Sequence, residues 1–299
     1  MTTTVGIPVF NEASTLGTLL DRLVTDPGVA AIVVADDGST DDSYAIASSF
    51  AERFDTVRVL WAPQRGGQLA AWRRAAEYAR TSTLCFIDAD ALPAEGAIAK
   101  LDGALQRDPA LVAASGRTVP DKASGAWPAA RFRAELVHRV RKLQRSRDAI
   151  IGRFFAVRRT WFLTALERPD IIANDAYIGT SARRSGRSVR YVEDAVCYYG
   201  EARTTFDFAA QRQRADAGYA QLRALDLLSR ADEPRLHEYV AIAIAASVHD
   251  PLGAFAWISQ QTRARGVRAY RAHGSNAGAW EPQATTKCKL DIPLPPGHA

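Results

Sequence analysis

Short apolar segments alternate with amphipathic ones over the N-terminal part of the chain. Between the apolar segments, leucine and alanine recur at helical spacing, as in Leu16, Leu19, Leu20 and Leu23. The apolar segments, each of a length typical of a buried strand, lie at 5–10, 31–35, 56–61, 83–87 and 111–115. This alternation predicts an α/β fold with a mostly parallel sheet and helices on both faces.

Polar residues follow three of the predicted strands. They are Asn11 and Glu12 after the first, Asp36 and Asp37 after the second, and Asp88 and Asp90 after the fourth. The carboxyl ends of parallel strands meet at one edge of a sheet, where such folds bind ligands. We therefore expect these side chains to converge on one site.

Asp88 and Asp90 flank Ala89, so in extended backbone both carboxylates point to the same side. Two such carboxylates suit a hard divalent cation that is shared with phosphate oxygens. The alternative is a turn, because turns favour aspartate for reasons unrelated to metals. The same choice applies to Asp36 and Asp37, which either form a turn with a helix cap or accept hydrogen bonds from a ligand.

The chain becomes strongly basic between residues 128 and 147. Its basic residues, opposed only by Glu135, are Arg131, Arg133, Arg139, Arg141, Lys142, Arg145 and Arg147. Apolar residues at helical spacing predict an amphipathic helix here. Its basic face is either solvated or a clamp for an anionic substrate or lipid headgroup.

The remainder predicts more strands and then helices. We expect strands at 150–157, 189–192 and 195–199, helices at 175–184, 211–228 and 239–265, and a proline-rich extended tail. Residues 239–248 form the most apolar stretch, about half the ~20 residues that cross a bilayer. A buried helix is the first interpretation of this stretch, and a helix on a membrane surface is the alternative.

Composition narrows the class of protein. With 299 residues, 47% hydrophobic and 24% charged, the chain is not disordered, and its net charge of +5 is too small to indicate nucleic acid. Cys85, Cys197 and Cys288 form no C-x-x-C pair, which favours reduced thiols in a cytoplasmic protein over a disulfide framework or zinc ribbon. The N-terminus lacks the basic and apolar regions of a signal peptide.

Several common catalytic motifs are missing. The sequence has no G-x-G-x-x-G, no P-loop, no H-E-x-x-H and no G-x-S-x-G, and its five histidines form no ligand-like cluster. Carboxylates at strand ends are therefore the main candidates for chemistry.

The segments at the strand ends occur in a characteristic order that continues downstream. They are PVFNE at 8–12, DDGSTD at 36–41, RGGQ at 65–68, DAD at 88–90, GRFFAVRR at 152–159, ND at 174–175, RRSG at 183–186 and QRQR at 211–214. In this order they resemble the family 2 inverting glycosyltransferases of the GT-A fold. The resemblance spans most of the chain and is specific for fold and reaction class, but not for the sugar or the acceptor.

The resemblance implies three regions. Residues 1–118 would form the nucleotide-sugar-binding half of a GT-A domain, 119–215 its acceptor-binding half, and 216–299 a helical C-terminal extension with an extended tail. The donor would be a nucleotide diphosphate sugar, with a UDP-linked sugar as the expectation. The acceptor would be a hydroxyl of a small molecule, a lipid-linked intermediate or a peptide. Nucleic acid is not an expected partner, peripheral membrane contact through 239–258 is left open, and the oligomeric state is unspecified.

The resemblance also assigns roles to single residues. The residues expected to bind the donor nucleotide are Pro8, Asn11, Glu12, Asp37, Gly67 and Asp88. Asp90, with Asp88, would hold Mg²⁺ or Mn²⁺ against the diphosphate leaving group. Asp175 would be the general base that deprotonates the acceptor, and Gln211 and Arg214 would lie near the diphosphate or acceptor. Trp127, in a predicted loop, is our candidate to stack on the acceptor.

Three positions depart from the family pattern. Asn174 replaces a glutamate, Ala215 replaces the tryptophan of Gln-x-x-Arg-Trp, and Gln68 stands where many members have a lysine after glycine. These departures leave a second hypothesis open, a non-catalytic binder of sugar nucleotides or a scaffold protein. A nucleotidyltransferase is a third, although residues 6–9 lack the glycine-rich basic loop that it would need.

Overall fold

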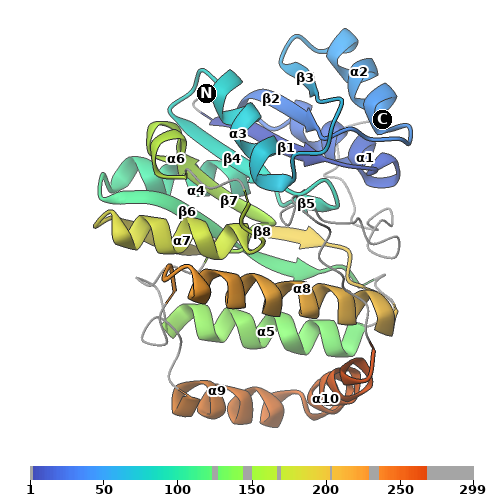
Figure 1. The fold of residues 1–299 in the computed structure, drawn as a ribbon, viewed down its shortest axis with the longest axis vertical. Helices are drawn as coiled ribbons and strands as arrows, with labels where there is room; N and C mark the ends of the chain where they lie inside the picture. The colour runs from blue at the N-terminus through green and yellow to red at the C-terminus, as the bar shows by residue number, and fades with distance from the viewer. Residues whose placement is uncertain are drawn as a thin grey trace.

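The computed structural model describes residues 3–122, 127–143, 150–166, 170–202, 204–228 and 236–267. These residues build an eight-stranded sheet in the order β3-β2-β1-β4-β7-β6-β8-β5 (Figure 1). The strands are β1 Thr3–Val9, β2 Val29–Asp36, β3 Val57–Trp61, β4 Thr83–Ile87, β5 Ala91–Pro93, β6 Leu111–Pro120, β7 Phe154–Arg158 and β8 Ser188–Tyr199.

The sheet consists of two parallel blocks joined by an antiparallel strand. Strands β3, β2, β1 and β4 run parallel, as do β6 and β8. Between the blocks, β7 is antiparallel to both β4 and β6, and β5 closes the edge antiparallel to β8. The expected α/β fold with a mostly parallel sheet is confirmed.

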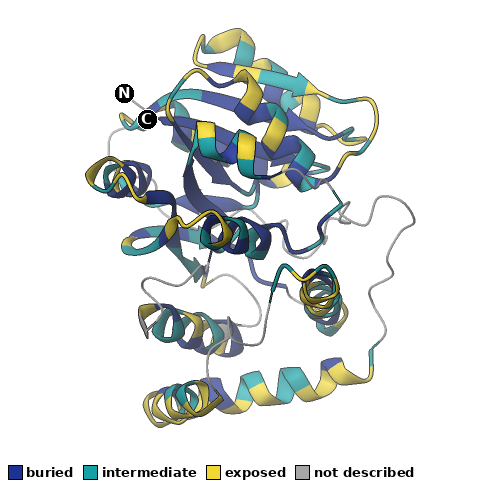
Figure 2. Cartoon of the chain, turned by 60° about the vertical axis from the view of Figure 1, so that its left-hand side comes forward, coloured by how far each residue is buried: buried dark blue, intermediate teal, exposed yellow. Residues whose placement is uncertain are grey.

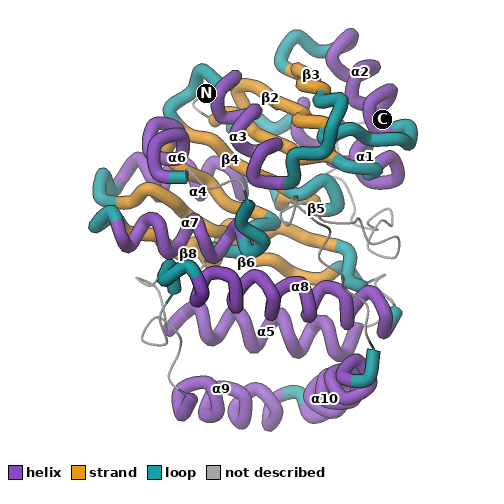
Figure 3. The backbone as a smooth tube through the Cα atoms, viewed as in Figure 1, coloured by secondary structure: helices purple, strands orange, loops and turns teal. Residues whose placement is uncertain are grey.

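Helices cover both faces of the sheet, as Figure 3 shows. The helices are α1 Ala13–Val24, α2 Ser43–Arg53, α3 Gln68–Tyr78, α4 Ala97–Arg107, α5 Trp127–Leu143, α6 Arg159–Ala165, α7 Asn174–Arg184, α8 Thr205–Ala224, α9 Leu236–His249 and α10 Pro251–Arg265. Helices α1, α2 and α4 pack on one face, while α3, α6, α7 and the end of α8 pack on the other. Alternate residues of β4 enter the two cores: Cys85 and Ile87 one, Leu84 and Phe86 the other.

The C-terminal helices are attached through α5. Phe132 and Leu136 of α5 are buried against Ala246 of α9 and Ala254 of α10. This cluster confirms the helical C-terminal extension. No helix in the described ranges is long and apolar enough to cross a bilayer.

The prediction that 239–248 is a buried helix is wrong for the described chain. Helix α9 packs through Ile242, Ala243 and Ala246, but Ile244 and Val248 are 61% and 75% exposed. Figure 2 shows the exposed positions along α9 and α10. Only one narrow stripe of the helix meets a neighbour, so apolar composition alone overestimated its burial.

Local signals misplaced some element boundaries. Pro93 ends β5 rather than starting a helix, and α4 begins at Ala97 after Gly96, whose φ of 68° terminates the preceding turn. The helix predicted at 239–265 is two helices, because Asp250 accepts a bond from the Gly253 amide and caps α10 before Pro251.

Candidate active site at the carboxyl edge of the sheet

The ends of β1 and β2 are tied together by Asn11. Its φ of 56° is left-handed, and its side-chain oxygen accepts bonds from the amides of Thr40 (2.7 Å) and Asp41 (3.3 Å). The Asn11 amide in turn donates to Ser39 Oγ at 3.0 Å. Asn11 therefore fixes the loop that carries the DDGSTD motif, and Glu12 next to it is buried and donates its amide to Ser43 Oγ at 2.7 Å.

Asp37 anchors the loop before α3. Its Oδ1 accepts a bond from the Gly66 amide at 3.0 Å and its Oδ2 one from the Gly67 amide at 2.8 Å. Arg74 of α3 pairs with Oδ1 at 3.2 Å. Both carboxylate oxygens thus have protein partners, so a nucleotide base at Asp37 would share them with this loop.

The loop brings Gln68 to the end of β4. Gln68 Nε2 donates to Asp88 Oδ1 at 2.9 Å, and Gln68 Oε1 accepts a long bond of 3.5 Å from Asn174. Gln68 therefore connects the first residues of α3 and α7 with Asp88. The three strand ends meet as the sequence predicted.

Charges of both signs gather around Asp88. Burial is the largest of the effects that raise the pKa of Asp88 to about 7, and the charges of Asp90 and Asp175 also raise it. Arg153 and Arg214 act in the opposite direction and lower this pKa. The Asp88 amide also donates to the Arg153 carbonyl at 3.0 Å. Three acids and two arginines therefore interact at this site, where the charge of Asp90 disfavours ionisation of Asp88.

Arg153 precedes β7 and is an electrostatic neighbour of Asp88, Asp90 and Glu201. Its guanidinium stacks over the Tyr199 ring, 4.0 Å from the centroid. Burial lowers the pKa of Arg153, but the charges of Asp90, Tyr199, Asp88 and Glu201 outweigh that effect and raise it. Arg153 is thus a permanent cation beside Asp88 and Asp90, suited to an anionic ligand.

Asp175 lies in the first turn of α7 and faces the start of β7. Its Oδ1 accepts a bond from the Ala176 amide at 2.8 Å and its Oδ2 one from the Gly152 amide at 3.3 Å. A Cβ on Gly152 would lie 3.3 Å from the Asp175 Cβ, so glycine permits this close approach. The neighbouring Asn174 is buried, and its side-chain amide donates to Gln68 Oε1.

The structure thus brings together four predicted site residues, Asp88, Asp90, Asp175 and Arg214. It places Pro8 within β1, paired with Ala35 of β2, and Asn11, Glu12, Asp37 and Gly67 in the loops that frame the site. Trp127 begins α5, but its side chain lies outside the part of the chain that the structure describes.

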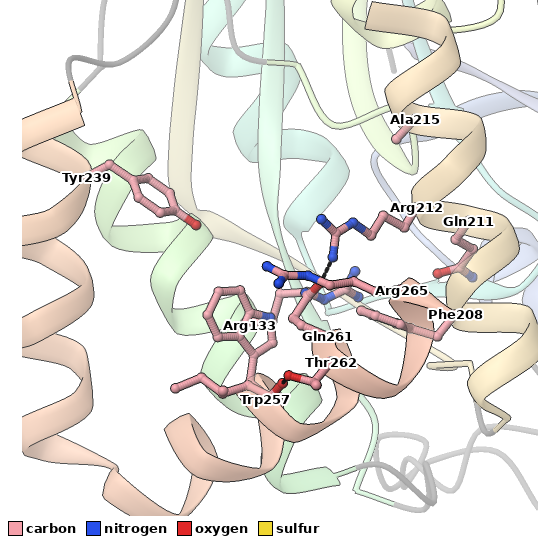
Figure 4. Close-up of a pocket in the computed structure, with 11 residues that line it drawn as sticks. Arg133, Phe208, Gln211, Arg212, Ala215, Tyr239, Trp257, Gln261, Thr262 and Arg265 are labelled. Atoms are coloured by element: carbon pink, nitrogen blue, oxygen red, sulfur yellow. Dashed lines mark hydrogen bonds between the residues drawn. The ribbon is translucent and has the colours of Figure 1, made fainter. Parts of the chain in front are cut away.

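Gln211 lines a neighbouring hollow, and it is not among the groups that influence Asp88. The hollow, of about 540 Å³, lies between α8 and the helices α5, α9 and α10 (Figure 4). Arg133, Arg212 and Arg265 line it together with Trp257 and Tyr239, and Arg212 is hydrogen-bonded to Gln261. Ala215, where the resembling family has tryptophan, also lines this hollow.

Helix α5 is less solvated than a basic surface helix would be. Arg133 pairs with the buried Glu201, Arg131 pairs with Asp250 at 2.7 Å, and Lys142 pairs with Glu193 at 2.8 Å. Arg141 is buried altogether. The solvated interpretation is wrong for Arg141, whereas the side chain of Arg133 stays 30% exposed although it pairs with Glu201.

The side chains that could ligate a divalent metal ion provide only part of the ligands it would need. Among the described residues, no group of three or more His, Cys, Asp or Glu side chains is placed to hold a metal ion. Asp88 and Asp90 provide two carboxylates whose repulsion a cation would relieve, and oxygen is the ligand that Mg²⁺ and Mn²⁺ prefer. The remaining ligands would have to come from a bound diphosphate and water.

Two residues of this site were missed as candidates. Arg153 stood within the GRFFAVRR segment, where its position directly after Gly152 and before the strand was the available signal. Gln68 was noted only as a departure, yet it contacts both Asp88 and Asn174.

Comparison with known proteins agrees with this geometry. The family model "Glycosyl transferase family 2" matches residues 4–164, more than half of the chain. The uncharacterized glycosyltransferase YibD of Escherichia coli K12 is 35% identical over 85 residues, which cover 28% of this chain and 24% of that protein.

Solved structures with the same fold cover more of the chain. The mannosyltransferase PcManGT from Pyrobaculum calidifontis, solved with GDP-Man and Mn²⁺, has a TM-score of 0.63 and 22% identity and covers 89% of this chain and 75% of its own. Glucosyl-3-phosphoglycerate synthase from Mycobacterium tuberculosis, solved with Mn²⁺, UDP and glucosyl-3-phosphoglycerate, has a TM-score of 0.54 and 20% identity over 77% of this chain and 81% of its own. The fold is therefore GT-A, and with its family match the chain belongs to glycosyltransferase family 2.

Proposed function

We propose that the protein is a metal-dependent inverting glycosyltransferase that moves one sugar from a nucleotide diphosphate donor to a hydroxyl acceptor. The observation that carries this proposal is the gathering of Asp88, Asp90 and Asp175 with Arg153 and Arg214 at the carboxyl edge of the sheet. A UDP-linked donor is the first choice to test, and a GDP-linked donor is the second.

The donor side of the site supports a charged leaving group. Cleavage of the bond to the anomeric carbon leaves negative charge on the diphosphate, which preorganised cations stabilise. Arg153 and Arg214 supply two such charges, and a divalent ion held by Asp88 and Asp90 would supply more. The two solved relatives that share the fold were crystallised with Mn²⁺ and a nucleotide or nucleotide sugar, which supports the same use here.

The acceptor side supports base catalysis by Asp175. A hydroxyl is a poor nucleophile, and a positioned carboxylate that takes its proton contributes about 10²–10⁴-fold. Asp175 is within electrostatic reach of Asp88 and is held by the amides of Gly152 and Ala176. Attack from this side, opposite the diphosphate, would invert the anomeric carbon.

Thermal stability with nucleotides tests the donor site. We expect UDP or GDP at 100 times its dissociation constant to add about 2.7 kcal/mol of stability when Mn²⁺ is present. Asp90→Asn should abolish the metal-dependent part, whereas Glu95→Gln, an exposed acid in the next loop, should preserve it. The proposal fails if no nucleotide stabilises the protein with Mn²⁺ or Mg²⁺, and this outcome would favour the scaffold alternative.

A further inference from the structure

Arg141 is buried, and among the residues that the structure describes it has no hydrogen-bond partner. The residue is 3% exposed, and its Nε, Nη1 and Nη2 atoms form no hydrogen bond within the described chain. Its guanidinium lies over the ring of Tyr191, 4.7 Å from the centroid. An arginine carries five N–H donors, so this burial leaves a strong, unsatisfied demand for an acceptor.

Another arginine of the same helix, Arg133, does have hydrogen-bond acceptors. Arg133 of α5 donates to the buried carboxylate of Glu201 and to Tyr199 Oη. Burial lowers the pKa of Arg141 to about 10, although Tyr191, Asp175 and Tyr219 act against this effect. Arg141 therefore remains a cation at neutral pH, buried and without the carboxylate that Arg133 has.

Asp175 is an electrostatic neighbour of both Arg141 and Asp88. The electrostatic neighbours of Asp88 include Asp90, Arg153, Arg214 and Asp175. Those of Arg141 are Tyr191, Asp175 and Tyr219, without either acid of the DAD motif. Asp175 is the group that the two sets share, so Arg141 and Asp88 are both close enough to Asp175 to influence its surroundings.

We propose that Arg141 binds an oxyanion, a phosphate or carboxylate, on the acceptor whose hydroxyl Asp175 deprotonates. This inference rests on the proposed function, since it takes Asp175, the charged neighbour of Arg141, as the base that meets the acceptor. An oxyanion there would accept the free donors of Arg141 in charge-assisted bonds, which are about twice as strong as neutral ones. The ligand class is an anionic acceptor, from either a water-soluble metabolite or a lipid phosphate.

The proposal predicts that Arg141 destabilises the folded protein when no ligand is bound. A buried charge without hydrogen bonds is destabilising, and an apolar residue of similar size commonly replaces it without loss. We expect Arg141→Met to raise the melting temperature of the ligand-free protein by a few degrees. A residue that served only the fold would give the opposite sign.

Binding of simple anions gives the second readout. The probes are inorganic phosphate, glycerate and dihexanoyl phosphatidate, each added with UDP and Mn²⁺ so that the diphosphate site is filled. We expect at least one probe to stabilise the natural protein, and Arg141→Met to weaken its binding about tenfold or more. Arg139→Met is the matched control, because Arg139 lies on the same helix and pairs with Glu135 at 2.8 Å.

The three probes distinguish the source of the anion. A response to phosphate or glycerate indicates a soluble acceptor, and a response to dihexanoyl phosphatidate alone indicates a lipid phosphate. Probe binding that is absent, or equal in Arg141→Met and Arg139→Met, would overturn the assignment of Arg141. Loss of UDP binding in all three proteins would instead contradict the proposed glycosyltransferase.

Discussion

At the scale of single residues, Asp37 shows how one carboxylate organises the donor side of the site. It accepts bonds from two consecutive glycine amides and pairs with Arg74, although the sequence suggested a direct contact with the nucleotide base. These contacts hold the loop that delivers Gln68 to Asp88. A residue near a ligand can thus act by shaping the loop as well as by touching the ligand.

We expect Asp37→Asn to destabilise the protein by about 1–3 kcal/mol, because it weakens bonds to two amides and a partly buried arginine. Urea unfolding followed by circular dichroism measures the change. Glu77→Gln is the control. The side chains of Glu77 and its partner Arg73 are both exposed, so we expect this variant to lose about 0.5 kcal/mol of unfolding free energy or less. Equal losses in the two variants would show that Asp37 does not anchor the loop.

At the scale of elements, the start of α3 depends on backbone that only glycine adopts readily. Gly67 has φ 87° and ψ 171° and forms the N-cap of this helix. Side chains larger than hydrogen are strained in this region of backbone space. The turn sets where Gln68 begins the helix and therefore where it meets Asp88.

Gly67→Ala should accordingly cost about 1–3 kcal/mol of unfolding free energy and weaken nucleotide binding. Gly17→Ala is the matched control within helix α1, where the added methyl group would lie 3.9 Å from Ile46 and meet no closer atom. That change should stabilise the helix by about 0.5–1 kcal/mol. A stable Gly67→Ala variant with full nucleotide affinity would contradict the role of this turn.

The sequence predicted well what depends on local pattern and strand direction. Asp37, Asp88 and Asp90 were placed at one edge because parallel strands end there, and Asn11 joined them through the loop after β2. The sequence pattern could not predict contacts between residues that lie far apart along the chain. The pair of Arg133 with Glu201 and the burial of Arg141 depend on how α5 docks beside β8, which no periodicity reveals.

At the scale of the whole molecule, the antiparallel strand β7 links the two halves of the site. It pairs with β4, which is followed by Asp88 and Asp90, and Gly152 and Arg153 directly precede β7. The Gly152 amide donates to Asp175 of α7, so the pair of strands β4 and β7 connects the acids expected for the metal with the expected base. The C-terminal helices α9 and α10 line the neighbouring hollow together with α5 and α8.

The central claim is that Asp175 activates the acceptor while the other acids hold the donor. The most direct measurement compares nucleotide release from UDP- and GDP-sugars by the natural protein and by Asp175→Asn, with water as the acceptor and donor binding measured in parallel. We predict release about 10²–10⁴-fold slower in the variant with donor affinity unchanged. Unchanged release would contradict the role of Asp175, and absent release by the natural protein despite donor binding would contradict catalysis at this site.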